Sequence, residues 1–170
     1  IAVGLHLGLS VSALQQGLLE FAGTKRRFEM IAQKKNVTLY DDYAHHPTEI
    51  QMTLLACRQW YPKEKIVVIF QPHTYSRTKM LLSSFARSFN FADEVLILPI
   101  FASAREKEDL TINSSILAAE ISKFHPKVSY FADKEKLIAY LRKTLAPGTV
   151  IFTMGAGDVY ELDKEIVAII

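Results

Sequence analysis

Hydrophobic positions at the start of the chain recur at helical spacing. Val11, Leu14 and Leu18 lie three and four residues apart, which is the spacing of one face of an amphipathic helix. Ser10 precedes them, and its short hydroxyl side chain suits a helix cap. We therefore expect residues 1–22 to be helical.

The spacing then changes to that of strands. The runs RFEMIAQ and VTLYDDY each carry apolar, β-branched or aromatic residues, and the polar tripeptide KKN separates them. Two such runs joined by a short polar turn are typical of a β-hairpin. The pattern predicts an antiparallel hairpin over residues 27–43.

From Pro47 onward, blocks of β-branched residues alternate with helical stripes. Pro47 suits the first turn of a helix, and Ile50, Leu54 and Cys57 form an apolar stripe behind it. Further helices are expected through Leu81, Phe85 and Phe89, over residues 112–124 and 134–143, and from Val159 onward. Strands are expected over residues 65–70, 94–100, 127–131 and 149–155. This alternation favours a mostly parallel, Rossmann-like α/β sheet with helices on both faces and its first strand in the antiparallel hairpin.

Composition narrows the class of protein. The 170 residues are 49% hydrophobic and 22% charged, which is ordinary for a globular domain, and the net charge of +2 gives no reason to expect a nucleic-acid partner. Apolar runs such as IVVIF are too short to span a bilayer. Cys57 is the single cysteine, so no internal disulfide is possible. We expect a cytoplasmic protein.

Three polar segments follow predicted strands. DDYAHHP follows VTLY, QPHTYSRT follows KIVVIF, and GAGD follows TVIFTM. Ligands of open α/β sheets bind beyond the carboxyl ends of the strands. The three segments together therefore predict a ligand site at one end of the sheet.

Each polar segment also has a plainer interpretation. Asp41 and Asp42 could simply end a strand, and His45 and His46 could be ordinary residues at a helix start. Adjacent histidines rarely point at the same ion, so we expect no metal site. GAGD is too short for a phosphate-binding fingerprint and could serve only a tight turn.

The arginines allow two interpretations as well. Arg77 lies beside His73 and Tyr75 near a predicted helix start, and its planar fork suits a carboxylate or a phosphate. A salt bridge on a solvated face is the alternative. The cluster from Lys25 to Arg27 could equally be a solvated face or reach a nucleotide phosphate.

The segments GTKRRFE, DDYAHHPTEI, FQPHTYSRT and MGAGD, in this order, resemble the carboxy-terminal domain of the ATP-dependent Mur ligases of peptidoglycan synthesis. The pair HHPTE and PHTYSRT points to the alanine-adding branch. The resemblance implies that residues 1–22 are the tail of a preceding central ATPase domain and that residues 23–170 are the carboxy-terminal domain. It also implies ATP and Mg²⁺ as cofactors, with the Mg²⁺ ligands in the central domain, and L-alanine and UDP-N-acetylmuramate as substrates joined through an acyl phosphate.

The resemblance also assigns roles to residues. Arg27 matches an arginine that contacts ATP phosphate, and Asp42 matches an acid near the nucleotide ribose. Tyr43, His45, His73 and Arg77 match the amino-acid pocket, in which Arg77 holds the carboxylate and one neutral histidine takes a proton from the ammonium group. Thr74 stands where many members have arginine. No residue is assigned a certain catalytic role.

No Gly-x-x-x-x-Gly-Lys-Ser/Thr sequence occurs in the chain, which begins in mid-pattern. We therefore expect a piece of a longer enzyme that ligates nothing by itself. The alternatives are a stand-alone nucleotide- or anion-binding α/β module and the corresponding domain of the murein tripeptide-recycling ligase.

Overall fold

The computed structural model describes residues 1–21, 23–104 and 106–170. The elements in chain order are α1 (Ala2–His6), α2 (Val11–Glu20), β1 (Glu29–Lys34), β2 (Val37–Asp42), α3 (Pro47–Trp60), β3 (Lys65–Phe70), α4 (Tyr75–Met80), α5 (Leu82–Phe85), β4 (Glu94–Ile97), α6 (Ser114–Ile121), β5 (Val128–Tyr130), α7 (Lys134–Thr144), β6 (Thr149–Met154), the 3-10 helix η1 (Val159–Leu162) and α8 (Asp163–Ile169).

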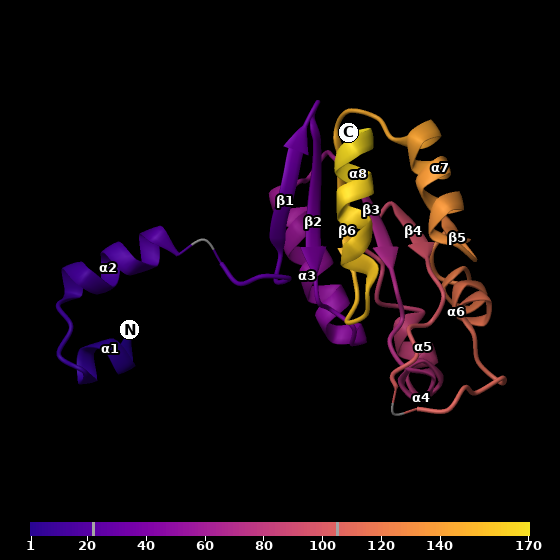
Figure 1. Ribbon diagram of the computed structural model, residues 1–170, viewed down its shortest axis with the longest axis horizontal. Coiled ribbons are helices and arrows are strands. Elements are labelled where there is room, and N and C mark those ends of the chain that lie inside the picture. Colours follow the sequence, from indigo (N-terminus) through magenta and orange to yellow (C-terminus); the bar gives the residue numbers. More distant parts are fainter. Residues whose placement is uncertain (22, 105) are drawn as a thin grey trace.

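Six strands form one sheet in the order β1-β2-β6-β3-β4-β5 (Figure 1). β1 runs antiparallel to β2, and every other neighbouring pair is parallel. The hairpin turns through Lys35 and Asn36, which have φ angles of 47° and 61°, as a two-residue turn between twisted strands requires. The predicted mostly parallel sheet with an antiparallel first strand is confirmed.

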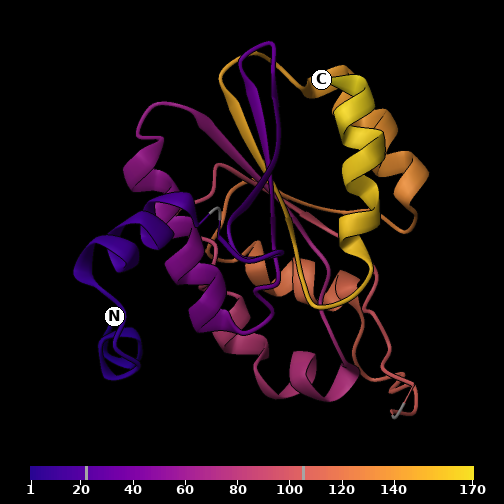
Figure 2. The ribbon, with the colours of Figure 1, turned by 60° about the vertical axis from the view of Figure 1, so that its left-hand side comes forward.

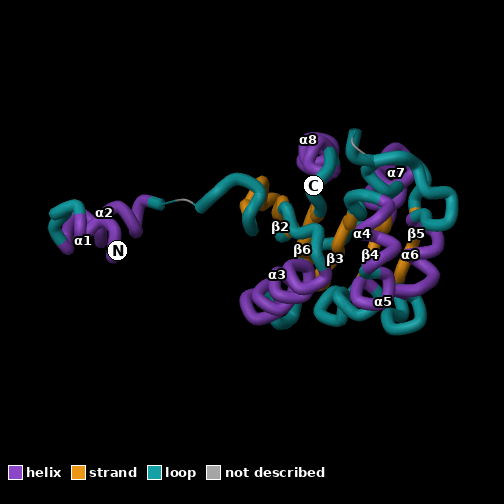
Figure 3. Tube along the Cα trace, turned by 90° about the horizontal axis from the view of Figure 1, so that it is seen from below, coloured by secondary structure: helices purple, strands orange, loops and turns teal. Residues whose placement is uncertain are grey.

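Helices cover both faces of the sheet, as Figure 3 shows from below. On one face, α3, α5 and α6 pack against side chains that include Val68, Phe70 and Phe152. On the other face, α7 and α8 pack against Ile69 and Ile151. Successive side chains of a strand point to opposite faces, so a strand that is buried on both faces reads as the continuous apolar run that the sequence shows.

Two predicted helices are interrupted in the structure. The helix expected through Leu81, Phe85 and Phe89 is two short helices, because Leu81 has φ −105° and ψ 17° and ends α4. Phe85 and Phe89 are nonetheless buried, as their spacing predicted.

The helix expected over residues 1–22 breaks at Gly8, whose φ of 78° favours glycine. Ser10 then caps α2 by accepting a hydrogen bond from the backbone N–H of Ala13 at 3.2 Å.

Helices α1 and α2 lie apart from the sheet in Figures 1 and 3, and Figure 2 turns them toward the viewer. No side chain of either helix is buried. The exposed apolar residues of this segment include Val3, Leu7, Leu18, Leu19 and Phe21. None of the helices in the described part of the chain has the length and apolarity needed to cross a bilayer.

Asp163 is an acid buried between β6 and α8. Its side chain is 8% exposed, and its Oδ1 accepts a hydrogen bond from Thr153 Oγ1 at 2.7 Å. The pKa of Asp163 is raised to about 7, mainly by burial; the hydrogen bond from Thr153 and the charge of Arg26 lower it, and the nearby Asp41 raises it. The folded protein therefore binds a proton at Asp163 that the unfolded chain releases near pH 4.

Stability should accordingly fall as the pH rises from about 4 through about 7. Asp163→Asn removes this loss and keeps the acceptor for Thr153. It should raise the free energy of unfolding at pH 8.5 by a few kcal/mol, since each unit of pKa shift corresponds to about 1.4 kcal/mol, and leave it unchanged near pH 4. Urea unfolding across this pH range is the measurement. The exposed Glu165→Gln is the control, and equal pH profiles for the two variants would contradict the assignment.

Candidate functional site

The three polar segments meet at the carboxyl ends of β2, β6 and β3, at the lower end of the sheet in Figure 1. The Gly155 N–H donates to Asp42 O at 3.1 Å, and the Gln71 N–H donates to Met154 O at 2.9 Å. Gly155 has a φ of 147°, and a Cβ there would lie 2.5 Å from Gln71 O. This glycine is therefore required by the close approach of two backbones.

Gln71 joins the β3 and β6 corners through its side chain. Its Nε2 donates to Asp158 Oδ1 at 2.7 Å, and its Oε1 accepts from the Val159 N–H at 3.1 Å. Lys134 Nζ lies 3.1 Å from Asp158 Oδ2. Burial raises the pKa of Asp158, but the bonds from Gln71 and Lys134 outweigh it and hold the pKa below its usual range. A cavity of about 360 Å³ adjoins these side chains.

Arg26, which the sequence analysis did not single out from its basic cluster, fastens the hairpin to the β6 corner. Its Nε donates to Asp41 Oδ2 at 2.9 Å, and its Nη2 donates to Gly155 O at 2.7 Å. The guanidinium carbon lies 5.0 Å from the Tyr43 ring centroid and 4.5 Å from that of Tyr160. Arg26 is thus a structural clamp, whereas its neighbour Arg27 is exposed.

Arg27 and Asp42, the two predicted nucleotide contacts, line one shallow cavity of about 410 Å³ beside α3. Asp42 is 4% exposed, and its two oxygens accept bonds from the N–H groups of Ala44 and Phe28, both at 2.8 Å. Burial raises the pKa of Asp42, although these bonds and Arg27 act in the opposite direction. The structure brings the predicted pair together and shows that the Asp42 carboxylate also fixes the turn after β2.

Tyr43 and His45 lie at the same corner, with ring centroids 5.3 Å apart. His45 Nδ1 lies 2.9 Å from Tyr43 O. Because a carbonyl oxygen only accepts, Nδ1 carries the proton, and in the neutral ring Nε2 is the acceptor. His46, by contrast, caps α3: its Nδ1 accepts from the Thr48 N–H at 3.3 Å, which is the plainer role considered for it.

His73 and Arg77 complete this group. Arg77 Nη1 lies 3.3 Å from His73 Nδ1, and the His73 ring lies 6.2 Å from that of His45 and stacks on Phe101 at 5.7 Å. Arginine only donates, so His73 Nδ1 is the acceptor and its proton lies on Nε2. Burial lowers the pKa of His73, and the charge of Arg77 and the neighbouring His45 lower it further.

Removing the Arg77 charge should therefore raise the pKa of His73. NMR titration of the histidine Cε1 protons is expected to show His73 titrating below its ordinary pKa in the parent chain and closer to that value in Arg77→Met. Lys79→Met removes a positive charge from the same helix, at its ion pair with Asp109, and should leave the His73 titration unchanged. Identical His73 curves in parent and Arg77→Met would disprove the coupling.

The start of α4 already holds a carboxylate of the protein. Glu106 Oε2 and Oε1 accept bonds from the N–H groups of Tyr75 and Ser76 at 2.7 and 2.8 Å. Thr74, directly before the helix, has a φ of 69°, a strained conformation for a β-branched residue. Because Glu106 occupies the helix start, the guanidinium of Arg77, the third residue of α4, is the group suited to an incoming carboxylate.

No group of three or more acidic, histidine or cysteine side chains suited to a metal ion occurs within residues 1–21, 23–104 and 106–170. The predicted residues instead form two adjoining sets. Arg27 and Asp42 line the cavity beside α3, and Tyr43, His45, His73 and Arg77 form a continuous row along the ends of β2 and β3.

A family described as "Mur ligase, glutamate ligase domain" matches residues 26–157. The chain belongs to the Mur ligase family. The match includes both predicted sets of site residues and stops before α8, and it confirms the expected membership of this family.

Curated relatives agree with the family match. A UDP-N-acetylmuramate–L-alanine ligase of Desulfitobacterium hafniense is 46% identical over 98% of this chain and 37% of that protein. An enzyme of the same name from Acetivibrio thermocellus is 44% identical over 99% of this chain and 37% of that protein. The chain thus spans little more than a third of these Mur ligases.

Solved structures share the fold. The crystal structure of UDP-N-acetylmuramate-alanine ligase from Thermotoga maritima matches with a TM-score of 0.77 and 27% identity, over 99% of this chain and 35% of that chain. A MurF ligase of the same organism, crystallised in complex with ADP, matches with a TM-score of 0.65 and 20% identity over 99% of this chain and 35% of that chain.

Proposed function

We propose that this chain is the carboxy-terminal part of an ATP-dependent ligase that adds L-alanine to UDP-N-acetylmuramate through an acyl phosphate, in cytoplasmic peptidoglycan synthesis. The observation that carries the proposal is the identity of 46% over 98% of the chain with a ligase of that name. The row from Tyr43 to Arg77 supports it, because it places a carboxylate-binding group beside two histidines.

Within this proposal, Arg77 binds the carboxylate of alanine. The amine must lose a proton before it attacks the acyl phosphate. His45 is better placed than His73 to accept that proton: the tautomers assigned above leave a lone pair on His45 Nε2, whereas His73 Nδ1 is occupied by Arg77. Phe101 stacks on the ring of His73, and Tyr43 lies edge-on to the ring of His45.

Arg27 and Asp42 serve the nucleotide in this proposal. The exposed guanidinium of Arg27 offsets charge on the ATP phosphates, and Asp42 accepts a hydrogen bond from the ribose. Support comes from their shared cavity beside α3. As the family resemblance implies, Mg²⁺ would be held by the preceding ATPase domain.

The domain division follows from the same proposal. Residues 1–22 belong to the preceding ATPase domain, against which the apolar side chains exposed on α1 and α2 would pack, and residues 23–170 form the carboxy-terminal domain. The phosphate-binding loop would lie in that ATPase domain. We therefore expect the 170-residue chain, given ATP, UDP-N-acetylmuramate and L-alanine, to release no phosphate.

The test uses the full-length ligase that contains this chain. Phosphate release is measured against L-alanine concentration at saturating ATP and UDP-N-acetylmuramate, for the parent and Arg77→Ala. Loss of the carboxylate contact should raise the KM for alanine at least about tenfold, or about 1.4 kcal/mol. Lys79→Ala, on the exposed side of the same helix, is the control and should leave this KM unchanged.

The outcomes separate the two sets of residues. An unchanged alanine dependence together with a shifted ATP dependence would transfer Arg77 to the nucleotide site and overturn its assignment. Absence of alanine-dependent phosphate release by the parent ligase would overturn the proposed reaction itself.

A further inference from the structure

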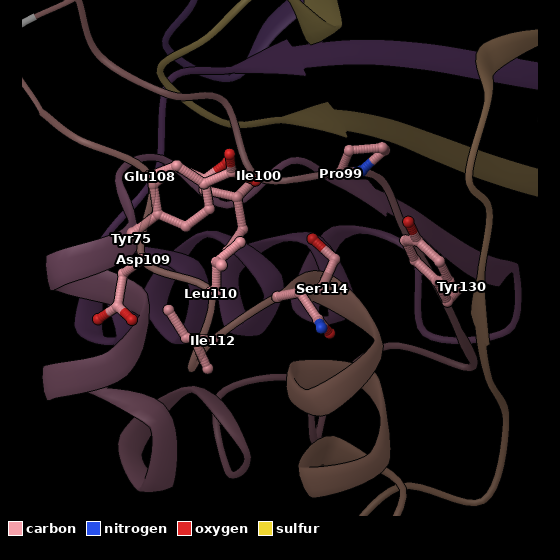
Figure 4. Close-up of a pocket in the computed structure, with 10 residues that line it drawn as sticks. Tyr75, Pro99, Ile100, Glu108, Asp109, Leu110, Ile112, Ser114 and Tyr130 are labelled. Carbon is pink, nitrogen blue, oxygen red and sulfur yellow. The ribbon is translucent and has the colours of Figure 1, made fainter.

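A third, smaller cavity lies at the start of α6. It encloses about 190 Å³, and its apolar walls are Tyr75, Ile100, Leu110, Ile112 and Tyr130. Figure 4 shows these side chains around the first turn of the helix. None of Tyr43, His45, His73 and Arg77 lines it.

Ser114 is the unusual group in this cavity. Its side chain is 2% exposed, and its Oγ has no hydrogen-bond partner. In Figure 4 the hydroxyl points from the helix start toward Pro99 and Ile100, into the cavity. A buried hydroxyl without a partner is costly, so its retention here points to a ligand that supplies one.

Backbone donors adjoin this hydroxyl. Asn113 Oδ1 accepts from the Ile116 N–H at 2.9 Å, and Asn113 O accepts from the Leu117 N–H at 3.1 Å. The N–H groups of Ser114 and Ser115 come before the first intrahelical bond, so the helix offers them no acceptor. The Ser114 hydroxyl and the N–H groups at the start of α6 together favour binding of the two oxygens of a carboxylate.

The rim limits the charge of the ligand. Glu108 and Asp109 are among the lining residues, and their charges repel phosphates and dicarboxylates more strongly than a monocarboxylate. Asp109 is held at 2.9 Å by Lys79 and turns away from Ser114 (Figure 4), whereas Glu108 is exposed. The volume is below that of the pockets that hold drug-sized ligands, so a nucleotide is excluded by size.

We propose that this cavity binds a small monocarboxylate with a short carbon chain, held by Ser114 and the start of α6. Free amino acids and simple carboxylic acids share this chemistry. The apolar walls would contact the carbon chain, and Glu108 would favour a ligand that also carries an ammonium group. The proposal is independent of the proposed ligase reaction.

The experiment records ¹H–¹⁵N NMR spectra of the 170-residue chain during titration with L-alanine, propionate and L-alaninamide. The Ser114 and Ser115 amide signals should shift with alanine and propionate but not with alaninamide, which lacks the carboxylate. Ser114→Ala should weaken binding about five- to tenfold through loss of one bond to a charged group. Ser115→Ala, the exposed neighbour on the same turn, should bind normally.

Removing an unpaired buried hydroxyl is not expected to destabilise the fold, so Ser114→Ala should remain testable. Arg77→Ala should leave the Ser114 and Ser115 shifts unchanged, which separates this cavity from the proposed alanine site. Stronger binding of alanine than of propionate, abolished in Glu108→Gln, would identify amino acids as the source. Equal binding would identify simple carboxylates. Shifts confined to His45 and His73, or an affinity for alanine and propionate that is unchanged in Ser114→Ala, would overturn the proposal.

Discussion

Replacing Arg26 by methionine is expected to lower the free energy of unfolding at pH 7 by about 3 kcal/mol, because removal of one partner leaves a buried charge uncompensated. Asp41 is 2% exposed and would keep a carboxylate in the core without its guanidinium at 2.9 Å. The carbonyl of Gly155 would lose its donor at 2.7 Å as well. Urea unfolding followed by circular dichroism measures the change.

Arg27→Met is the matched control, since it removes the same charge from the next, exposed position and should cost less than about 0.5 kcal/mol. The double variant Arg26→Met/Asp41→Asn should recover part of the loss because it removes both charges. Equal stability of the two single variants would show that Arg26 is not the clamp.

The fold could largely be predicted from the sequence because burial imposes regular spacing. The apolar run of β3 and the stripe of Ile50, Leu54 and Cys57 on α3 depend on strand and helix periodicity alone, and all of these side chains are buried. The break at Leu81 could not be predicted in this way. Leu81, Phe85 and Phe89 keep helical spacing through the break, and a change in backbone angle leaves no periodic signal.

The grouping of residues at the candidate site could be predicted in part, for a related reason. The ends of parallel strands meet, so DDYAHHP, QPHTYSRT and GAGD could be placed together from the order of the strands. Which side chains of the cluster bond to one another depends on distances in the folded chain. Nothing local distinguishes Arg26, the clamp, from Arg27, which is exposed, or indicates that Gln71 binds Asp158 from 87 positions away. The orphaned Ser114 hydroxyl likewise follows from packing, not from its neighbours in sequence.

Replacing Gly155 by alanine is expected to destabilise the chain by roughly 3 kcal/mol, the sum of overpacking and a strained φ. Its φ of 147° lies in a region that L side chains rarely adopt, and the new Cβ would lie 2.5 Å from Gln71 O. That contact is with backbone, so no rotamer change relieves it. β6 and β3 must separate at their carboxyl ends instead.

Separation of β6 and β3 should also displace His73 from Arg77, because Gln71 follows the end of β3 and precedes His73 by two residues. We expect weaker coupling between Arg77 and His73 in Gly155→Ala, seen as a higher His73 pKa by NMR, in addition to the lower free energy of unfolding. Gly17→Ala is the control. A Cβ at Gly17 meets nothing within 4 Å, and alanine should stabilise the exposed helix α2 by about 0.5–1 kcal/mol. If Gly155→Ala were as stable as the parent, the β6 and β3 corners would tolerate separation, and the site would not depend on this close approach.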